Sequence, residues 1–494
     1  MAGSLLKVTD VDKSFVGVHA LKNVSFSMDP AEVHSLAGEN GSGKSTLIKI
    51  ISGVHAPDSG HIELDGTGFD RLTPMQAINH GVQVIYQDFS VFPNLTVMEN
   101  LAVNSELAEH RKFVNRKRMR AIAEEAISRI GFDVDLDETV ESLSVAQKQM
   151  IAISRALIFN TKVIIMDEPT TALTKKEVRT LFDTILNLKE RGIATLFVSH
   201  KLNEVFEISD RFTILRSGEV VATGNAAELT EEEFSFHMTG RKFAKRHFEP
   251  TIASETPVLE VRGIGREQEF RDVSFSLRPG EILGITGLLD SGRARVALSL
   301  FGIAPIHSGQ LLIRGQHVRI DSPEAAMRNR IGFVPEDRLT EGLFLPQSIA
   351  DNVVAARIDS LTRRFGFLDE KKRSREVEKW VRELAIATPD PANACHTLSG
   401  GNQQRVVLAK WLARELDILV LNGPTVGVDI GSKYDIHGIL QELANQGLGL
   451  IIVSDDLPEV LENCSRVLVM KGGSVVADLD AGATTESEIL SYML

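Results

Sequence analysis

Short apolar runs alternate with longer amphipathic stretches along the whole chain of 494 residues. The runs Val163 to Met166 and Leu450 to Val453 are apolar at every position and have the length of strands, which is typical of strands covered on both faces of a sheet. The stretch from Asn115 to Phe132 has a helical pattern instead. Each half of the chain begins with β-branched runs, continues into helical pattern and ends in strand–helix alternation. The pattern predicts an α/β fold, with a parallel-rich core and a helical subdomain in each half.

The two halves are copies of one unit. VSFSM, from Val24, recurs 249 positions later as VSFSL, from Val273, and VIYQ recurs at the same spacing as FVPE. LSVAQKQ, from Leu143, recurs 255 positions later as LSGGNQQ, from Leu398. Ordered matches at nearly constant spacing indicate an internal duplication. The change of spacing predicts one insertion of six residues in the second copy, within the part that corresponds to Gln87 to Leu143.

The duplication sets the expected domain boundaries. A chain of this length is too long for one hydrophobic core. The segment His247 to Pro257 falls between the copies, is polar and contains two prolines, as linkers do. We expect a first domain over residues 1–245, a linker over residues 246–257 and a second domain over residues 258–494.

The composition limits where such a chain can act. It is 43% hydrophobic and 24% charged, which is ordinary for a soluble globular protein. No apolar run approaches the roughly 20 residues needed to cross a bilayer, and the N-terminal sequence has no signal-peptide core. We expect the chain to stay in the cytoplasm, so that any role at a membrane works through partner proteins.

The charge and the cysteines exclude further classes of function. A formal net charge of −13 argues against a broad nucleic-acid-binding surface. The basic run from Arg111 to Arg120 is interpreted as the solvated face of a helix rather than as a phosphate-binding patch. Cys395 and Cys464 offer neither metal-ligand spacing nor a disulfide framework, and we interpret both as reduced packing residues.

One segment of the first copy has the pattern of a phosphate-binding loop. Residues Gly38 to Ser45 fit G-x-x-x-x-G-K-[ST] and lie between a strand pattern and a helix pattern. Glycines let backbone N–H groups turn toward phosphate oxygens, and the N-terminus of the next helix adds positive potential. Lys44 would neutralise the β- and γ-phosphates, and the Ser45 hydroxyl would bind Mg²⁺. The predicted ATP-binding residues of this segment are Gly38, Asn40, Gly41, Ser42, Gly43, Lys44, Ser45 and Thr46.

Two carboxylates end the apolar strand that precedes residue 167. Asp167 is placed to bind Mg²⁺, directly or through water, and Glu168 to orient or deprotonate the attacking water. Such a pair is common at strand ends. It becomes a specific signal because it follows a phosphate-binding loop by about 120 residues.

These residues resemble the ATP-binding-cassette (ABC) family, and the resemblance covers nearly the whole chain. It implies two tandem P-loop NTPase domains, each with a RecA-like core. Gln87 matches the glutamine of the family's Q-loop, a catalytic and Mg²⁺-binding position. His200 resembles the switch histidine that contacts the γ-phosphate, and Phe15 resembles the aromatic residue that stacks on adenine. LSGGNQQR, from Leu398, resembles the family signature, with asparagine where glutamine is usual. Its predicted nucleotide-binding residues are Ser399, Gly400, Gly401 and Asn402.

The second copy narrows the resemblance to the tandem ATPase subunits of bacterial monosaccharide importers, the ribose, galactose and xylose group. It contains LSGGNQQ, PEDR from Pro335 to Arg338, and VGVDIGSK from Val426 to Lys433. The last segment resembles RGVDVGAK of that group, although Val426 replaces the arginine.

The second copy also lacks most of the chemistry of the first. Arg293 stands in place of the P-loop lysine, and a planar guanidinium does not fit the place of a lysine. The remaining replacements remove a Mg²⁺-binding hydroxyl, a metal-binding carboxylate, the catalytic base, the switch histidine and the Q-loop glutamine. They are Ala294, Asn422, Gly423, Asp455 and Glu336. We expect no appreciable hydrolysis at this P-loop.

The resemblance assigns these losses to one of two composite sites, because cassettes of this family are expected to pair head to tail. The intact first P-loop would face Ser399 to Gln403 of the second copy. The damaged second P-loop would face Ser144 to Gln147 of the first, where Val145 and Ala146 replace glycines. Asp429, in the loop after the strand-end residues, is retained in the second copy and would serve the intact site, whereas Thr174 replaces it in the first. Independent drift would have scattered the losses, so we expect one catalytic and one degenerate site.

The resemblance implies the ATP-hydrolysing subunit of an importer, at the inner face of the membrane. Its partners would be integral-membrane permease subunits, as a dimer, and indirectly a solute-binding protein. The alternatives are a soluble tandem cassette protein that acts on ribosomes, for which this linker is short, and a regulatory ATP-binding module. The transported solute is not readable from the sequence.

Overall fold

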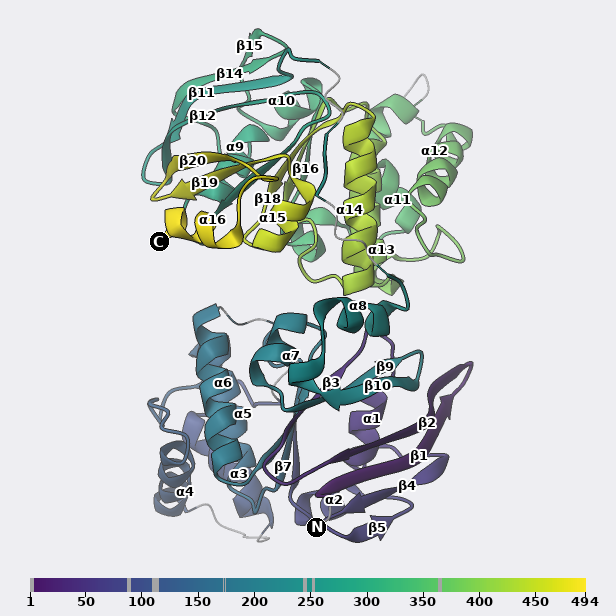
Figure 1. Cartoon of the computed structure of the whole chain (residues 1–494), viewed down its shortest axis with the longest axis vertical. Coiled ribbons are helices and arrows are strands. Elements are labelled where there is room, and N and C mark those ends of the chain that lie inside the picture. Colours follow the sequence, from purple (N-terminus) through teal and green to yellow (C-terminus); the bar gives the residue numbers. More distant parts are fainter. Residues whose placement is uncertain are drawn as a thin grey trace. The chain divides into compact units, whose positions relative to one another are not determined.

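The computed structural model describes residues 4–86, 90–108, 115–171, 173, 175–242, 247–250, 254–362 and 367–494. The chain divides into two compact units, Met1–Phe243 and Ala244–Leu494. Each unit contains a four-stranded antiparallel sheet and a six-stranded, mainly parallel sheet (Figure 1). The predicted α/β fold, written twice along the chain, is confirmed.

The strands of the first unit form two sheets. The four-stranded sheet has the order β2-β1-β4-β5, with β1 (Leu6–Phe15), β2 (Val18–Met28), β4 (Ser59–Leu64) and β5 (Thr67–Phe69). The six-stranded sheet has the order β10-β9-β3-β8-β7-β6, with β3 (Val33–Ala37), β6 (Val82–Ile85), β7 (Val163–Asp167), β8 (Ala194–Val198), β9 (Arg211–Arg216) and β10 (Glu219–Asn225). Strands β3 and β6 to β9 are parallel, so their carboxyl ends meet at one edge of the sheet.

Helices cover both faces of this parallel sheet. Their bounds are α1 (Lys44–Ile51), α2 (Pro74–Asn79), α5 (Val145–Ala156), α6 (Lys175–Glu190), α7 (Leu202–Ile208) and α8 (Glu231–Thr239). Helix α1 packs Leu47, Ile48 and Ile51 into the core between the two sheets, and burial of each such side chain stabilises the fold by about 1.5–3 kcal/mol. Helices α5 and α6 cover the opposite face. Because both faces are covered, β7 is apolar at four consecutive positions, as its sequence predicted.

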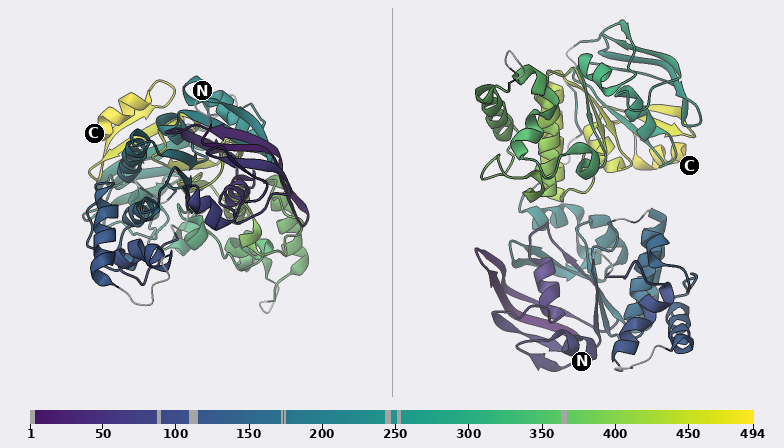
Figure 2. Two further views of the ribbon diagram at one scale, coloured as in Figure 1. Left: turned by 90° about the horizontal axis from the view of Figure 1, so that it is seen from below. Right: turned by 180° about the vertical axis from the view of Figure 1, so that it is seen from behind.

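The predicted helical subdomain consists of α3 (Val97–Ala108) and α4 (Arg116–Ser128), which pack on α5. Both helices lie at the end of the unit opposite the four-stranded sheet (Figures 1 and 2). Met119, Ala123 and Ala126 of α4 face the core, and the arginines of the described part of the basic run lie on its outer face. Arg120 forms an ion pair with Asp137 at 2.5 Å, which agrees with a solvated helix face.

The second unit repeats this architecture. Its sheets have the orders β12-β11-β14-β15 and β16-β17-β18-β13-β19-β20. The strands are β11 (Leu259–Arg266), β12 (Phe270–Leu277), β13 (Ile282–Gly287), β14 (Ser308–Ile313), β15 (Gln316–Val318), β16 (Ile331–Val334), β17 (Ile418–Asn422), β18 (Gly449–Val453), β19 (Arg466–Lys471) and β20 (Ser474–Asp480). The helices are α9 (Arg293–Leu300), α10 (Pro323–Arg328), α11 (Ile349–Val354), α12 (Glu370–Glu383), α13 (Gly400–Leu412), α14 (Ile430–Asn445), α15 (Leu457–Asn463) and α16 (Glu486–Met493).

The structure divides the six extra residues of the second copy into two insertions, where the sequence predicted one. Asn100 accepts a hydrogen bond from Phe92 N, and Asn352 accepts the same bond from Phe344 N. These pairs differ by 252 positions, halfway between the offsets of 249 and 255. Three residues are therefore inserted before Phe344, where the chain forms a π-helical turn over Arg338–Gly342. The other three follow Asn352.

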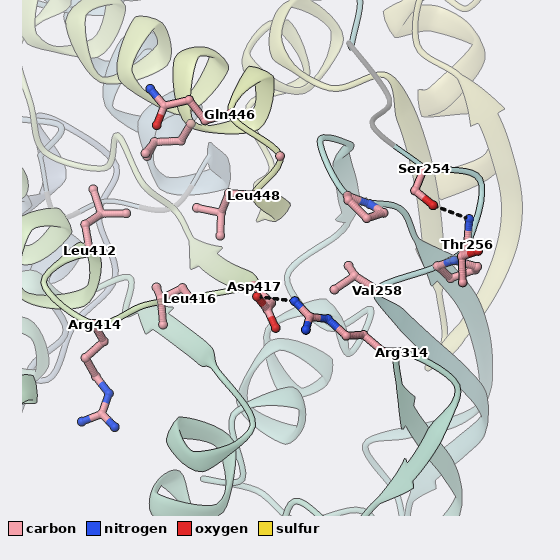
Figure 3. Close-up of a pocket in the computed structure, with 14 residues that line it drawn as sticks. Ser254, Thr256, Val258, Arg314, Leu412, Arg414, Leu416, Asp417, Gln446 and Leu448 are labelled. Atoms are coloured by element: carbon pink, nitrogen blue, oxygen red, sulfur yellow. Dashed lines mark hydrogen bonds and ion pairs between the residues drawn. The ribbon is translucent and has the colours of Figure 1, made fainter.

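An ion pair connects the two sheets within each unit, with the charges exchanged. In the second unit, Arg314 after β14 lies 2.8 Å from Asp417 before β17, in a cleft of about 590 Å³ (Figure 3). In the first unit the equivalent positions are Asp65 and Lys162, whose charged atoms lie 2.5 Å apart. The position of the pair is thus common to both copies, whereas the sign at each end is reversed.

Within the described residues, every helix is too short or too polar to span a membrane. Cys395 and Cys464 are free and buried in the second unit, and burial raises the pKa of the Cys395 thiol to about 11. Both therefore act as packing residues, as their spacing predicted.

Candidate active site

The phosphate-binding loop of the first unit connects β3, which ends at Ala37, to α1, which begins at Lys44. Gly43 precedes the helix in the left-handed conformation (φ 109°), and no side chain caps the helix. The first N–H groups of a helix have no partner inside it, so those of α1 remain available to a ligand. Together with the positive end of the helix dipole they favour an anion at this position.

Glycine is required in this loop for lack of space as well as for conformation. A Cβ atom on Gly38 would lie 2.5 Å from Leu215 O, and one on Gly43 would lie 2.6 Å from Ala20 O. Both clashes are with backbone, which cannot move aside cheaply. At Gly41 no atom lies within 4 Å of the added position, so this residue borders open space, and its φ of 79° still favours glycine. The loop is thus tight on its protein side and open toward the cleft.

Lys44 is buried with its ammonium group inside the loop. Its Nζ donates to Gly38 O at 2.6 Å and to Glu39 O at 3.0 Å. Burial lowers the pKa of Lys44, while the carboxylates of Glu168 and Asp167 oppose that shift. A cation so poorly solvated interacts strongly with an incoming phosphate.

Glu168 and His200 form a hydrogen-bonded pair beside Lys44. His200 Nδ1 lies 3.2 Å from Glu168 Oε1, and this bond is the main reason why the pKa of Glu168 lies below its usual value. Burial and the charge of Glu168 raise the pKa of Asp167. Glu168 also has φ of 48°, a left-handed conformation that a non-glycine residue adopts at a cost of about 1–3 kcal/mol. Such strain is typical of functional sites.

Lys44, Asp167 and Glu168 line one cleft of about 840 Å³, within the usual range for small-molecule sites, whereas His200 reaches it only through its bond to Glu168. Phe15, at the end of β1, is 44% exposed and borders the cleft beside Val18 and Ala20. The exposed ring is available to stack on a base. The predicted residues that line the cleft are Phe15, Asn40, Gly41, Gly43, Lys44, Ser45, Thr46, Asp167 and Glu168. Gln87 and Thr174 lie outside the described residues.

The residues present fit ATP with Mg²⁺. The uncapped start of α1 and the buried Lys44 suit phosphate oxygens, and the exposed Ser45 hydroxyl and Asp167 are oxygen ligands of the kind Mg²⁺ prefers. The apolar ring of Phe15 lines the same cleft.

The equivalent P-loop of the second unit is satisfied by its own side chains. Arg293, the first residue of α9, is buried, and its guanidinium lies 3.5 Å from Asp455. A carboxylate thus neutralises the cation that a phosphate would otherwise meet. Asn422 donates to Glu336 at 3.5 Å. Gly423 keeps the left-handed backbone of Glu168 and the same hydrogen bond from its N–H to the neighbouring strand, but it has no side chain to act as a base.

The second unit also has no aromatic residue at the position of Phe15, a difference that the sequence analysis did not predict. Leu6 pairs with Met28, and Leu259 pairs with Leu277. The hairpin between these strands is therefore four residues shorter in the second unit. Its tip carries Gln268 at the position of Phe15 in β1.

The two signature segments begin their helices differently. In the first unit, Ser144 caps α5, because its side chain accepts from Gln147 N while the Gln147 side chain accepts from Ser144 N. In the second unit, Ser399 precedes α13 but makes no side-chain bond to the helix backbone; its Oγ accepts from Asn402 instead. The start of α13 is therefore open to a ligand and the start of α5 is not.

Gly401 lies against the start of α14, a contact that the sequence did not predict. A Cβ atom on Gly401 would lie 1.9 Å from Ser432 Oγ and 2.5 Å from Ser432 Cβ. Ser432 is in turn bonded to Asp429, which caps α14. The segment VGVDIGSK is thus built into the signature helix by direct contact, and its small residues at 431 and 432 were the available signal.

A family model described as "ABC transporter" matches residues 21–171 and 270–426. The chain is 41% identical over 493 residues to a putative ribose/galactose/methyl galactoside import ATP-binding protein of Agrobacterium fabrum, covering 99% of the chain and 97% of the relative. It is 40% identical over 489 residues to the ribose import ATP-binding protein RbsA of Halalkalibacterium halodurans, covering 99% and 98%. For RbsA of Bacillus subtilis the identity is 37% over 486 residues, covering 98% of each chain.

Proposed function

Because the chain belongs to the ABC transporter family, we propose that it is the ATP-hydrolysing subunit of an importer that energises uptake of a monosaccharide. The relatives named above, which align over nearly their whole length, are sugar import ATP-binding proteins. None of them supports the alternative of a ribosome-associated protein. The two domains would be residues 1–245 and 258–494, joined by a short linker.

The observation that carries the proposal is the cleft of the first unit, where a buried ammonium group meets two carboxylates. Lys44 would bind the β- and γ-phosphates. Glu168, whose low pKa keeps it ionised at neutral pH, would accept a proton from the attacking water. His200 would orient Glu168 and contact the γ-phosphate. Phe15 would stack on adenine.

The metal site of the proposal uses Ser45, Asp167 and Gln87. Mg²⁺ bound there would neutralise charge on the phosphate oxygens. Ser45 and Asp167 line the same cleft as Lys44. Burial of Asp167 in a site that already contains Glu168 raises its pKa, and a bound cation would restore its charged form.

We further propose a single catalytic centre assembled from both domains, with Ser399, Gly400, Gly401, Asn402 and Asp429 serving the first P-loop. Three differences between the copies support this. The start of α13 is open whereas α5 is capped, the second P-loop is neutralised by Asp455, and the second unit has Gln268 at the position of Phe15. All three losses would fall on one composite site.

The partners in this proposal are permease subunits, as a dimer, and indirectly a solute-binding protein. The chain would lie at the inner face of the cell membrane, bound to the permease. ATP would close the two domains and hydrolysis would reopen them, and the permease would follow that motion.

The substitution Glu168→Gln tests the function and the single site together. Steady-state ATPase activity of the full chain should fall by at least 100-fold while ATP binding is retained, because the isosteric amide cannot accept the proton. Asp455→Asn, at the degenerate P-loop, is the matched control and should leave turnover near that of the wild type. Residual activity above about one tenth in the Glu168→Gln variant would contradict a single catalytic centre.

A further inference from the structure

Arg338 connects three segments of the second unit that are far apart in the sequence. It follows β16 and begins the π-helical turn Arg338–Gly342. Its Nη1 donates to Val426 O at 2.6 Å and its Nη2 donates to Gly427 O at 2.8 Å. The guanidinium thus donates hydrogen bonds to two consecutive carbonyls of the loop that leads into Asp429.

The same guanidinium lies against the signature helix. A Cβ atom on Gly400 would lie 2.8 Å from Arg338 Nη2, and one on Gly427 would lie 3.2 Å from Nη1. Gly400 is the first residue of α13. Both glycines therefore make room for the arginine, which fixes the spacing between the start of α13 and the loop before α14.

The other end of the turn is also anchored. Lys410, buried in α13, donates from Nζ to Gly342 O at 2.6 Å. Asp337 caps the turn by accepting from Leu339 N and Thr340 N. The segment that carries Arg338 is thus capped by its own Asp337 at one end and bonded to α13 at the other, so that a guanidinium placed on it has a defined position.

The first copy has lost the arginine and both glycines together. Phe89 occupies the sequence position of Arg338 at the offset of 249. Val145 and Ala172 occupy those of Gly400 and Gly427 at the offset of 255. The arginine and the space for it occur in the copy with the open signature helix and are missing from the copy with the capped one.

The two carbonyl bonds use the Nη atoms of Arg338 and leave its Nε unbonded. The buried Nε of Arg338 makes no hydrogen bond within the described residues, and an unsatisfied buried donor costs free energy. Burial also lowers the pKa of Arg338, which reports the same desolvation of the charge.

We propose that Arg338 is a positioning residue that holds Asp429 and the signature residues Ser399 to Gly401 in the register needed for ATP hydrolysis. The inference rests on the proposed function, in which these groups complete the catalytic centre. Arg338 lines no part of the cleft around Lys44. It therefore acts on turnover and leaves the affinity of the first P-loop for ATP unchanged.

Three full-length variants test this role. In Arg338→Leu, kcat should fall at least tenfold, while the dissociation constant for a fluorescent ATP analogue changes less than twofold. In Arg338→Lys, which retains the charge but cannot bridge two carbonyls with a rigid fork, kcat should fall at least threefold without loss of thermal stability. Arg319→Leu, whose side chain is 85% exposed and forms an ion pair with Asp321, is the matched control and should behave as wild type.

A double-mutant cycle separates positioning from a general loss of structure. Because Arg338 acts in part through Asp429, the loss of activity in Arg338→Leu combined with Asp429→Ala should be smaller than the two single losses added as free energies. Additive losses would overturn the proposal, as would an unchanged kcat or a weaker ATP affinity that matches the loss of turnover. The proposed function is judged separately: if wild type hydrolyses ATP, Glu168→Gln does not, and Arg338→Leu is normal, only the role of Arg338 is wrong.

Discussion

The contact between Gly401 and Ser432 allows a sharp test of the signature geometry. In Gly401→Ala the new methyl group would lie 1.9 Å from Ser432 Oγ and 2.5 Å from Ser432 Cβ. Relief requires the starts of α13 and α14 to move apart. Overpacking of this kind costs about 1–3 kcal/mol, and the better helix propensity of alanine returns up to about 1 kcal/mol. We expect a net destabilisation of about 1–2 kcal/mol.

The measurement can be restricted to the second unit, because both tryptophans of the chain, Trp380 and Trp411, lie there. For a domain of this size, about 1 kcal/mol changes the Tm by roughly 2–4 °C. The Tm from tryptophan fluorescence should therefore fall by about 2–8 °C in Gly401→Ala, and ATPase activity should fall with it. A transition followed by a probe in the first unit is the internal control and should not move.

Ser432→Gly supplies the compensating change, since it removes both atoms that the methyl group would meet. Alone it should destabilise α14 by about 1–2 kcal/mol, through lost helix propensity and the lost hydrogen bond to Asp429. Combined with Gly401→Ala it should recover at least 1 kcal/mol relative to the sum of the single changes. If the two effects simply add, the steric account of Gly401 is wrong.

Three further expectations follow from the geometry. Glu459 is buried and bonded to His437, and its pKa is about 2, against 4.5 for an unperturbed group. Its contribution of about 3 kcal/mol to the free energy of unfolding is complete above pH 4.5 and is lost as the pH falls toward 2. The stability of Glu459→Gln, followed by tryptophan fluorescence, should therefore lack this acid dependence. Phe15→Ala should raise KM for ATP by about 5–150-fold, the loss of a stacking contact worth about 1–3 kcal/mol, with a smaller effect on kcat; an unchanged KM would remove Phe15 from the adenine site. The paired change Asn422→Asp with Gly423→Glu should not restore hydrolysis to a Glu168→Gln chain, and measurable recovery would show that the remaining losses in the second P-loop are unimportant.

The sequence predicted the fold and the chemistry of the first P-loop because both depend on local pattern. An apolar strand such as β7 can be recognised from neighbouring residues alone, and so can the glycine spacing around Lys44. Because the second half is a copy of the first, the same fold was predicted for the second unit. Contacts between distant segments were not predictable in this way. The small residues at 431 and 432 are compatible with a close approach, but their types do not identify Gly401 as the partner of Ser432, or Gly427 as that of Arg338.

The shape of the insertions was missed for a related reason. A change of offset from 249 to 255 is equally consistent with one insertion or two. Only the matching hydrogen bonds of Asn100 and Asn352 show where the registers diverge. The shortened hairpin of the second unit escaped notice because its strands β11 and β12 keep the alternating pattern of the first copy while the tip between them loses four residues.

The reversed ion pair between the sheets has a consequence for the folding of a duplicated chain. Tandem copies of one fold can exchange equivalent parts while they fold. If the four-stranded sheets were exchanged, Asp65 would meet Asp417, and Arg314 would meet Lys162. Each correct pair stabilises its unit by only about 0–1 kcal/mol, but each exchanged pair would bring like charges together. The two copies therefore carry opposite charges at equivalent positions. This difference favours packing of each four-stranded sheet on the six-stranded sheet of its own unit.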